Sequence, residues 1–343
     1  MKKRPSHDKD PVYFWDTASG FLNNELPKIR RKSPNTVSAY RRSLNCFIDF
    51  LESEKSIRRE MITYHDFNRN NLKEYLLYMK DACKLSEKTC NLRLTAIRSL
   101  LSYASEETTD ITSIYVNAKC IKNLPVVQKP IEYFENDQTK AILNAFPEDR
   151  KLCRRNRMLL ILGYDAGLRV SELTSLKVSS LHLDAGTPYV TVVGKGAKYR
   201  NVPLMARTTE HLSFYLEEFH HPCDIEDPLF YTRTHGIIHP LSDDTIQKIL
   251  KKAVEKAKGS VPMPESVHFH MIRKTRAMDL YQSGCPLSYI QQLLGHESIS
   301  TTSGFYAFAT LKTLSDAIEK ANPSGNDEKK WKLEDVRKVL YRL

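Results

Sequence analysis

Residues 188–204 read PYVTVVGKGAKYRNVPL, and this segment sets the expected class of fold because it differs from the helical pattern around it. β-Branched and aromatic residues stand on both sides of Gly194 and Gly196, which is typical of two strands joined by a tight turn. The segment therefore predicts a β-hairpin with Lys195 at its tip. Apolar residues at helical spacing flank it, so the sequence predicts a mainly α fold with a small antiparallel β-sheet, an α+β class.

Two amphipathic helices are expected in the first part of the chain. One begins with Ser33 as the N-cap and Pro34 in the first turn, and the other runs through SEKTCNLRLTAIRSLLSYA at residues 86–104. Each has one apolar and one polar face. The residues expected to be buried are Val37, Tyr40, Leu44, Phe47, Ile48 and Leu51 in the first helix, and Cys90, Leu94, Ile97, Leu101 and Ala104 in the second.

Four basic residues lie off these apolar faces, namely Arg41, Arg42, Lys88 and Arg98. A basic helical face is most often simply solvated. These faces are free of acidic side chains, however, and two such faces could hold the phosphates of a nucleic acid. The four residues are therefore candidate DNA contacts, with a solvated face as the alternative.

Length and charge narrow the class of protein. The 343 residues predict two domains, and 41% hydrophobic with 27% charged residues is an ordinary globular balance. The 52 Lys and Arg against 41 Asp and Glu leave a formal net charge of +11, which favours a polyanionic partner, nucleic acid first and an acidic membrane surface second. No segment approaches the roughly 18 apolar residues of a membrane span. We therefore expect no membrane span, and nucleic acid rather than a membrane is the expected partner.

The seven cysteines include no C-x-x-C pair, which indicates reduced thiols in the cytoplasm rather than a disulfide framework or a zinc site. HHPC at residues 220–223 is the only local cluster of His and Cys, and it lacks a second ligand pair at metal spacing. We expect it to be a surface loop. Neither a metal nor another cofactor is expected.

The domain boundary is expected where periodicity is lost, between Thr108 and Tyr133, a segment that contains Pro125 and Pro130. Residues 1–126 are expected to form a helical domain and residues 127–322 a second domain. Residues 323–343 follow a turn-rich stretch and are expected to form a tail helix that docks on a neighbouring protomer.

Arginine 169 is the first candidate for chemistry. It stands in DAGLRVSEL at residues 165–173, between Leu168 and Val170. A guanidinium flanked by core residues needs an anionic partner to offset its desolvation. Glu172, three residues on, could supply a purely structural ion pair, and an external anion is the alternative.

A second cationic group is expected at the start of a helix in HFHMIRKTRAMDLY, residues 268–281. His270 and Arg273 are three residues apart and share one helical face. With Lys274 and Arg276 they place positive charge where the helix macrodipole disfavours it. Such a start suits a helix whose N-terminus faces a phosphate.

The last candidates lie in LLGHESISTTSGFYAF at residues 293–308. An apolar helix is expected to end at Gly295 in the left-handed conformation, which places His296 just beyond the helix end. A further helix is expected from about Gly304. Tyr306 lies off its apolar stripe, so its hydroxyl rather than its ring is the expected functional part.

Together these residues resemble the catalytic set of the tyrosine recombinases, also called phage-type integrases. The resemblance covers nearly the whole chain, and implies a helical core-binding (SAM-like) domain followed by the catalytic domain. It rests on four boxes in the family's order, AGLRVSEL, GKGAKYRNVPL, HMIRKTRA and LLGHESISTT, which contribute Arg169, Lys195, His270, Arg273 and His296, with Tyr306 after them.

The resemblance implies a metal-free transesterification. Tyr306 would attack a DNA phosphodiester and form a 3′-phosphotyrosyl bond, with its proton accepted by His270 and the leaving 5′-oxygen protonated by Lys195. The arginines and the second histidine would stabilise the developing charge. The family picture adds specific recombination sites in double-stranded DNA, a protein dimer on each site and a homotetramer that joins two sites.

Two departures from the Xer-like pattern bear on the biological role. The spacing from His296 to Tyr306 is one residue longer, and Lys274 stands where histidine is usual. These departures favour an integrase or transposase of a mobile genetic element, in the cytoplasm at the nucleoid. The alternatives are a Xer-type resolvase of chromosome or plasmid dimers, a type IB topoisomerase and a non-catalytic DNA-binding protein.

Overall fold

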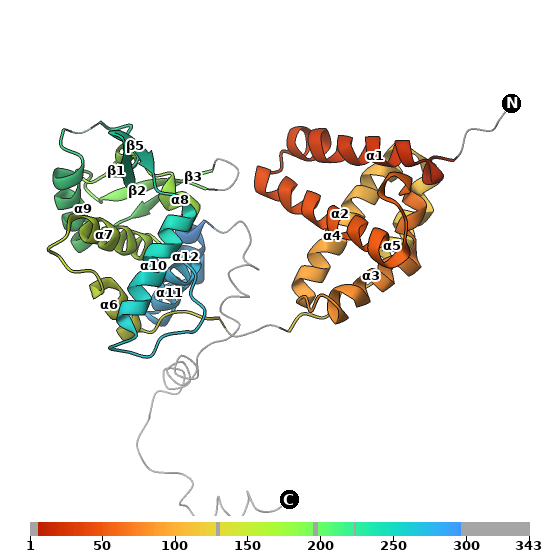
Figure 1. Cartoon of the computed structure of the whole chain (residues 1–343). Coiled ribbons are helices and arrows are strands. Elements are labelled where there is room, and N and C mark those ends of the chain that lie inside the picture. Colours follow the sequence, from red (N-terminus) through yellow and green to blue (C-terminus); the bar gives the residue numbers. More distant parts are fainter. Residues whose placement is uncertain (1–5, 128–130, 195–197, 223, 296–343) are drawn as a thin grey trace, which may run out of the picture. The chain divides into compact units, whose positions relative to one another are not determined.

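The computed structural model describes residues 6–127, 131–194, 198–222 and 224–295 (Figure 1). The chain divides into two compact units, Met1–Lys129 and Pro130–Leu343. Within the described ranges no helix is long and apolar enough to cross a membrane. The expected tail helix at residues 323–343 lies outside the described residues.

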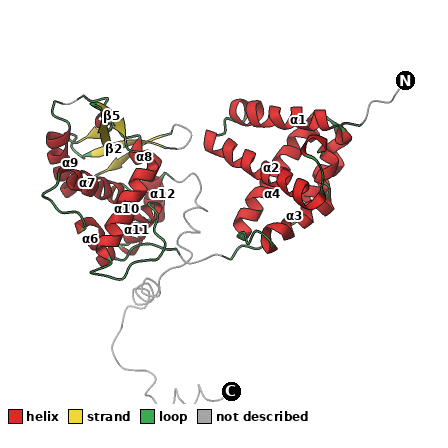
Figure 2. Ribbon diagram, in the orientation of Figure 1, coloured by secondary structure: helices red, strands yellow, loops and turns green. Residues whose placement is uncertain are grey.

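The described part of the first unit consists of helices and their connecting loops (Figure 2). Ser33 caps α2 (Pro34–Lys55) by accepting the Thr36 N–H at 3.3 Å, and Ser86 caps α4 (Glu87–Glu107) through Thr89 in the same way. The apolar faces predicted for both helices are confirmed as core, with the first two positions of the α2 stripe partly buried. The other elements are α1 (Pro11–Gly20), the π-helix η2 (Phe21–Ile29), α3 (Arg69–Asp81), α5 (Thr112–Lys119) and the 3-10 turns η1 (His7–Lys9), η3 (Arg59–Met61), η4 (Tyr64–Phe67) and η5 (Thr109–Ile111).

The expected linker is shorter than its sequence suggests. Residues 109–119 form η5 and α5, and Ile114 and Ala118 of α5 are buried in the core of the first unit. A helix of eight residues has too little intrinsic stability to show in a sequence pattern, so packing against α4 supplies it. Of the described residues in this segment, 122–127 and 131–133 have no regular structure.

The second unit contains the predicted hairpin, which is confirmed. Strand β2 (Tyr189–Val193) pairs antiparallel with β3 (Tyr199–Pro203), and Val190 lies opposite Val202. The short β1 (Leu181–His182) extends this sheet on the other side of β2. Strands β4 (Tyr231–Thr234) and β5 (Ile237–Pro240) form a second hairpin, which the sequence pattern did not predict. Positive φ at both turn residues, His235 and Gly236, fits the type I′ turn that joins such strands.

The strands gather at the top of the second unit in Figure 1, with the helices beside and below them, and the unit confirms the mainly α fold with small antiparallel sheets. Gly163 of α7 lets Phe269, the residue before α11, pack closely against α7. An added Cβ at Gly163 would lie 2.8 Å from the Phe269 ring. The start of α11 is thereby fixed against α7. The helices are α6 (Asn136–Asn144), α7 (Lys151–Asp165), α8 (Val170–Thr174), α9 (Ala206–Phe219), α10 (Asp243–Ala257), α11 (His270–Gln282) and α12 (Leu287–Leu294), with the 3-10 turn η6 (Val178–Ser180).

The prediction of a surface loop at HHPC is wrong for its first residue. His220 is 4% exposed, and its Nε2 lies 2.9 Å from the Leu229 carbonyl oxygen. Burial lowers the pKa of His220. The imidazole therefore packs as a neutral core group.

Candidate active site

Arg169 occupies the N-cap of α8, immediately after α7 ends in a left-handed turn at Gly167 (φ +58°). Its Nη1 donates to Oε1 of Glu172 at 2.7 Å, and its backbone N–H donates to Oε2 at 2.8 Å. The ion pair predicted from the three-residue spacing is thus present. Glu172 is 3% exposed, whereas a third of the Arg169 side chain is open to solvent.

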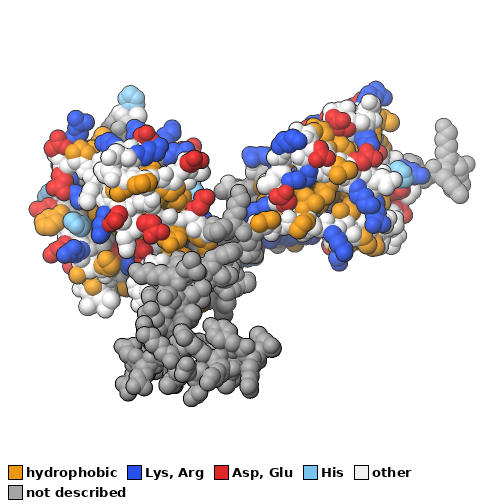
Figure 3. Space-filling model, turned by 90° about the horizontal axis from the view of Figure 1, so that it is seen from below, with side chains coloured by type: hydrophobic (Ala, Val, Ile, Leu, Met, Phe, Trp, Pro, Cys, Tyr) orange, Lys and Arg blue, Asp and Glu red, His pale blue; other side chains and the backbone are white. Residues whose placement is uncertain are grey.

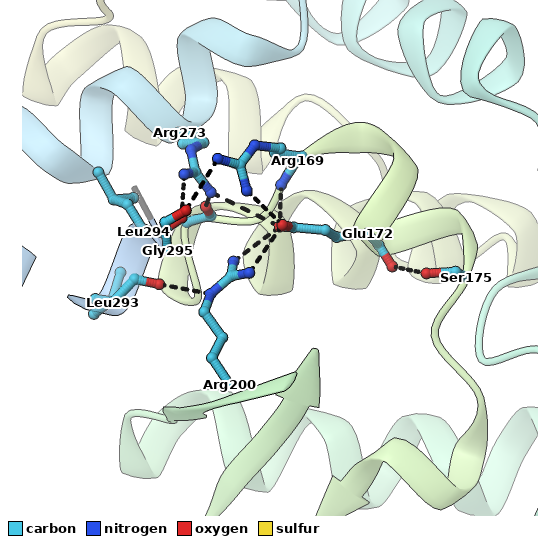
Figure 4. A network of polar contacts seen from close by, with 9 residues as sticks. Arg169, Glu172, Ser175, Arg200, Arg273, Leu293, Leu294 and Gly295 are labelled. Carbon is cyan, nitrogen blue, oxygen red and sulfur yellow. Dashed lines mark hydrogen bonds and ion pairs between the residues drawn. The ribbon is translucent and has the colours of Figure 1, made fainter. Parts of the chain in front are cut away.

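Arg200 of strand β3 approaches the same carboxylate from the opposite side (Figure 4). Its Nη1 and Nη2 donate to the two oxygens of Glu172 at 2.9 Å each, a bidentate pair. Its Nε donates to the carbonyl oxygen of Leu293 at 2.9 Å. Arg200 therefore joins the hairpin, α8 and the end of α12.

These contacts keep Glu172 ionised. Burial would raise the pKa of its carboxyl, but the hydrogen bonds from Arg200 and from the backbone and side chain of Arg169 outweigh burial and lower the pKa to about 2. The buried negative charge is consequently a permanent part of the unit at neutral pH.

Arg273 lies on α11 behind this pair and is 2% exposed. Its Nη1 donates to the Gly167 carbonyl oxygen at 2.7 Å, and its Nη2 donates to the carbonyl oxygen of Leu294. Nη1 is also 3.8 Å from Oε2 of Glu172, an ion pair without a hydrogen bond. The structure thus brings the first and third sequence boxes together around one carboxylate.

Gly295 ends α12 in the left-handed conformation predicted for it (φ +62°). Its carbonyl oxygen accepts from Arg169 Nη2 at 3.4 Å. An added Cβ would lie 3.1 Å from Cδ of Arg200, so glycine is required here by backbone conformation and by space. The end of α12 is held against both arginines.

His270 is the first residue of α11, one turn before Arg273. Its position is set from α10, because the Gln247 amide donates to the Val267 carbonyl at 2.9 Å and accepts the Phe269 N–H at 2.8 Å. Although His270 is exposed, desolvation by the surrounding groups and the charges of neighbouring cations, Arg273 first, lower its pKa to about 4. The ring is neutral at pH 7 and can accept a proton.

Lys195, His296 and Tyr306 lie outside the described residues. Gly194 directly precedes Lys195 in the sequence, and Gly295 directly precedes His296. Both glycines lie close to the arginines around Glu172. A Cβ on Gly194 would lie 3.5 Å from Nη1 of Arg200 and 3.8 Å from Oε1 of Glu172, and Gly295 has the contacts given above.

The four predicted DNA contacts differ in their exposure and in their hydrogen bonds within the first unit. Arg42 and Lys88 are exposed, and Arg41, also exposed, donates to Asn23 Oδ1 at 2.9 Å. Arg98 donates to the carbonyl oxygens of Ala118 and Ile121 and to Asn123 Oδ1, which fixes residues 118–123 on α4. Its guanidinium has a structural role in this unit.

Basic side chains on the surface shown in Figure 3 are interspersed with acidic ones, so the net charge alone does not locate a binding face. Among the described residues, no group of three His, Cys, Asp or Glu side chains is placed to hold a metal ion. In the second unit, Arg169, Arg200 and Arg273 form a cluster around Glu172. Guanidinium groups are suited to binding an anion such as a phosphate.

Family comparisons agree with an enzyme that acts on phosphodiesters. The Phage integrase family model matches residues 132–311, and the Phage integrase N-terminal SAM-like domain model matches residues 21–108. The chain belongs to the phage integrase family, the tyrosine recombinases, which cleave and rejoin DNA strands.

Curated relatives span most of the chain. An integrase/recombinase of Sinorhizobium fredii is 28% identical over 92% of this chain and 93% of its own length. The tyrosine recombinase XerD of Oceanobacillus iheyensis is 31% identical over 86% of this chain and 94% of its own. The tyrosine recombinase XerC of the same organism is 29% identical over 92% of this chain and 98% of its own length.

Solved structures share the fold. The XerH site-specific recombinase bound to a palindromic difH substrate matches with a TM-score of 0.67 at 22% identity, covering 92% of this chain and 90% of that one. The Tn1549 transposon integrase in complex with transposon right end DNA matches with a TM-score of 0.66 at 18% identity, covering 90% and 98%.

Proposed function

We propose that this chain is the site-specific recombinase of a mobile genetic element and that it acts through a 3′-phosphotyrosyl intermediate. The observation that carries the proposal is the convergence of separate sequence boxes on one buried carboxylate, Glu172. The proposed catalytic residues are Arg169, Lys195, His270, Arg273, His296 and Tyr306.

The described part of the site suits the stabilisation of a phosphodiester under attack. Attack by the Tyr306 oxygen forms a P–O bond, breaks the bond from phosphorus to the 5′-oxygen and adds negative charge to the non-bridging oxygens. Arg169, whose side chain is one third exposed, would meet that charge. His270, neutral at pH 7, accepts the tyrosine proton, and Lys195 donates one to the 5′-oxygen.

The proposed domains follow the sequence boundaries. Residues 1–126 hold the DNA as a core-binding domain, with exposed Arg41, Arg42 and Lys88 on phosphates. Residues 127–322 carry the catalysis, and residues 323–343 dock on a neighbouring protomer. A dimer on each duplex site and a homotetramer across two sites supply the four active sites that exchange of four strands requires. The double-stranded DNA substrate places the protein at the nucleoid.

A suicide duplex tests the proposed nucleophile. A nick just beyond the scissile phosphate lets the released fragment diffuse away, so the covalent adduct accumulates and is seen as a band of lower mobility in denaturing gels. We expect an adduct with wild type and none with Tyr306→Phe. Tyr289→Phe is the matched control, because Tyr289 on α12 is 64% exposed, and it should form the adduct normally. An adduct with Tyr306→Phe would refute the assignment.

The duplex sequence comes from covalent capture of wild type on sheared DNA from its own host, followed by sequencing of the trapped ends. Adducts that map to repeats on both sides of the gene support the mobile element. A single chromosomal site away from the gene would instead support dimer resolution, the role that the XerC and XerD names of the relatives favour.

A further inference from the structure

Glu172 has its hydrogen-bonding capacity filled by two arginines. An ionised carboxylate offers about four lone-pair positions. Arg169 takes two of them, with Nη1 at 2.7 Å and the backbone N–H at 2.8 Å. Arg200 takes the other two at 2.9 Å each.

This saturation has a consequence for Arg273. Its Nη1 is 3.8 Å from Oε2 of Glu172, close enough for attraction but beyond a hydrogen bond. Backbone carbonyls of Gly167 and Leu294 accept from its two terminal nitrogens instead. Those carbonyls belong to the turn before Arg169 and to the end of α12, so the guanidinium is held by the elements that build the site.

We propose that Arg200 is a positioning residue for the strand-cleavage reaction. It occupies half of the acceptor positions of Glu172 and so keeps the carboxylate from capturing Arg273. Its third bond, from Nε to the Leu293 carbonyl oxygen, fixes the end of α12 just before His296. The role deepens the proposed function and rests on it.

The side chain of Arg200 supports a positioning role over contact with the substrate. It is 13% exposed, and all three of its nitrogens are bonded within the protein. Arg169, by contrast, keeps a third of its side chain open. Loss of Arg200 would leave two acceptor positions of the buried Glu172 carboxylate without a donor, which is unfavourable. Because Arg273 is only 3.8 Å away, we expect it to move and donate to Glu172.

The first test is the single-turnover cleavage rate on the captured suicide duplex. Arg200→Met should slow cleavage by about 100-fold, the scale for loss of one preorganised donor in a transition state. Arg200→Lys keeps the charge without the bidentate fork and should lose less. Binding of the duplex should change little, because phosphate contacts elsewhere dominate affinity. Cleavage by both variants at the wild-type rate would overturn the role of Arg200 while the proposed function stands.

Arg155→Met is the matched control for a buried arginine. Arg155 is 9% exposed and donates to the Tyr231 carbonyl oxygen at 2.8 Å, away from Glu172. The Arg155→Met variant should have a lower melting temperature than wild type, and the cleavage rate of the folded variant should be unchanged. If it slows cleavage as much as Arg200→Met, the effect is one of general stability, and the positioning role is refuted.

A double variant separates positioning from simple structural support. If Arg200 acts by restraining Glu172, then Arg200→Met should slow cleavage less in a Glu172→Gln background than in wild type, because the uncharged amide no longer attracts Arg273. Losses that multiply would contradict the proposal.

A crystal structure of the variant gives a readout independent of cleavage. In Arg200→Met, or in Arg200→Lys if the methionine variant does not fold, Nη1 of Arg273 should come within hydrogen-bonding distance of Glu172. A separation that remains at 3.8 Å would overturn the proposal even if wild type formed no DNA adduct. An absent adduct alone would refute only the proposed function.

Discussion

Replacing Glu172 by glutamine should change how the stability of the catalytic unit depends on pH. Glu172 is ionised in the folded protein down to about pH 2, whereas the unfolded carboxyl titrates near its ordinary value of 4.5. Because the folded pKa is the lower one, the stabilisation is fully present above pH 4.5 and is lost as pH falls toward 2. The glutamine variant lacks this term at every pH.

The size of the effect follows from the two pKa values. A difference of 4.5 − 2 = 2.5 units corresponds to about 3 kcal/mol at neutral pH. Linkage then removes about 2 kcal/mol of this between pH 6 and pH 3. Since Glu172 is 3% exposed, solvent screening reduces this figure little.

Urea unfolding at several pH values between 3 and 7, with hydrogen exchange of the α8 peptide to assign the transition, measures the effect. The free-energy gap between wild type and Glu172→Gln should be largest at pH 7 and should narrow by about 2 kcal/mol by pH 3. Glu218→Gln is the control, since Glu218 also pairs with an arginine but is 31% exposed, and it should show a much smaller change. Parallel curves for wild type and Glu172→Gln would refute the reasoning.

Four further substitutions test separate parts of the structure. Gly295→Ala should destabilise the protein by about 1–2 kcal/mol in thermal unfolding, the penalty for a side chain in the left-handed region, and should slow cleavage because its Cβ presses on Arg200. Gln247→Leu should speed hydrogen exchange in the loop before α11 and slow cleavage without weakening DNA binding. Arg98→Met should lower the urea midpoint of the first unit, because the hydrogen bonds to Ala118 and Ile121 are lost. Lys88→Gln should leave that midpoint unchanged. It should make the slope of log DNA affinity against log salt concentration shallower by about one, the slope of one phosphate contact.

Local patterns predicted those elements whose causes are local. Ser33 and Ser86 stand before long amphipathic runs, and both cap helices as expected. Gly295 ends its helix with the predicted positive φ. The eight residues of α5 escaped prediction because tertiary packing, rather than their own pattern, stabilises them.

The site was predictable only in part. Glu172 could be assigned as the partner of Arg169 from spacing along one helix. Its second partner, Arg200, is 28 residues away on a strand, and a register that brings it to α8 is a property of the folded sheet. The same holds for the partners of Arg98, whose guanidinium donates to the carbonyl oxygens of Ala118 and Ile121. Its helical face suggested a DNA contact, which stays a prediction.

The charge of the cluster gives Glu172 a reason to be buried among arginines. Arg169, Arg200 and Arg273 with one carboxylate carry a net charge of 3 − 1 = +2. A phosphodiester has one negative charge, and attack by a tyrosinate brings it to two, so the cluster matches the transition state better than the ground state. Without the carboxylate, three guanidiniums would repel one another in a poorly hydrated site before DNA arrives. Glu172 thus offsets the charge of Arg200, and in the proposed reaction the charges of Arg169 and Arg273 would remain for the phosphate.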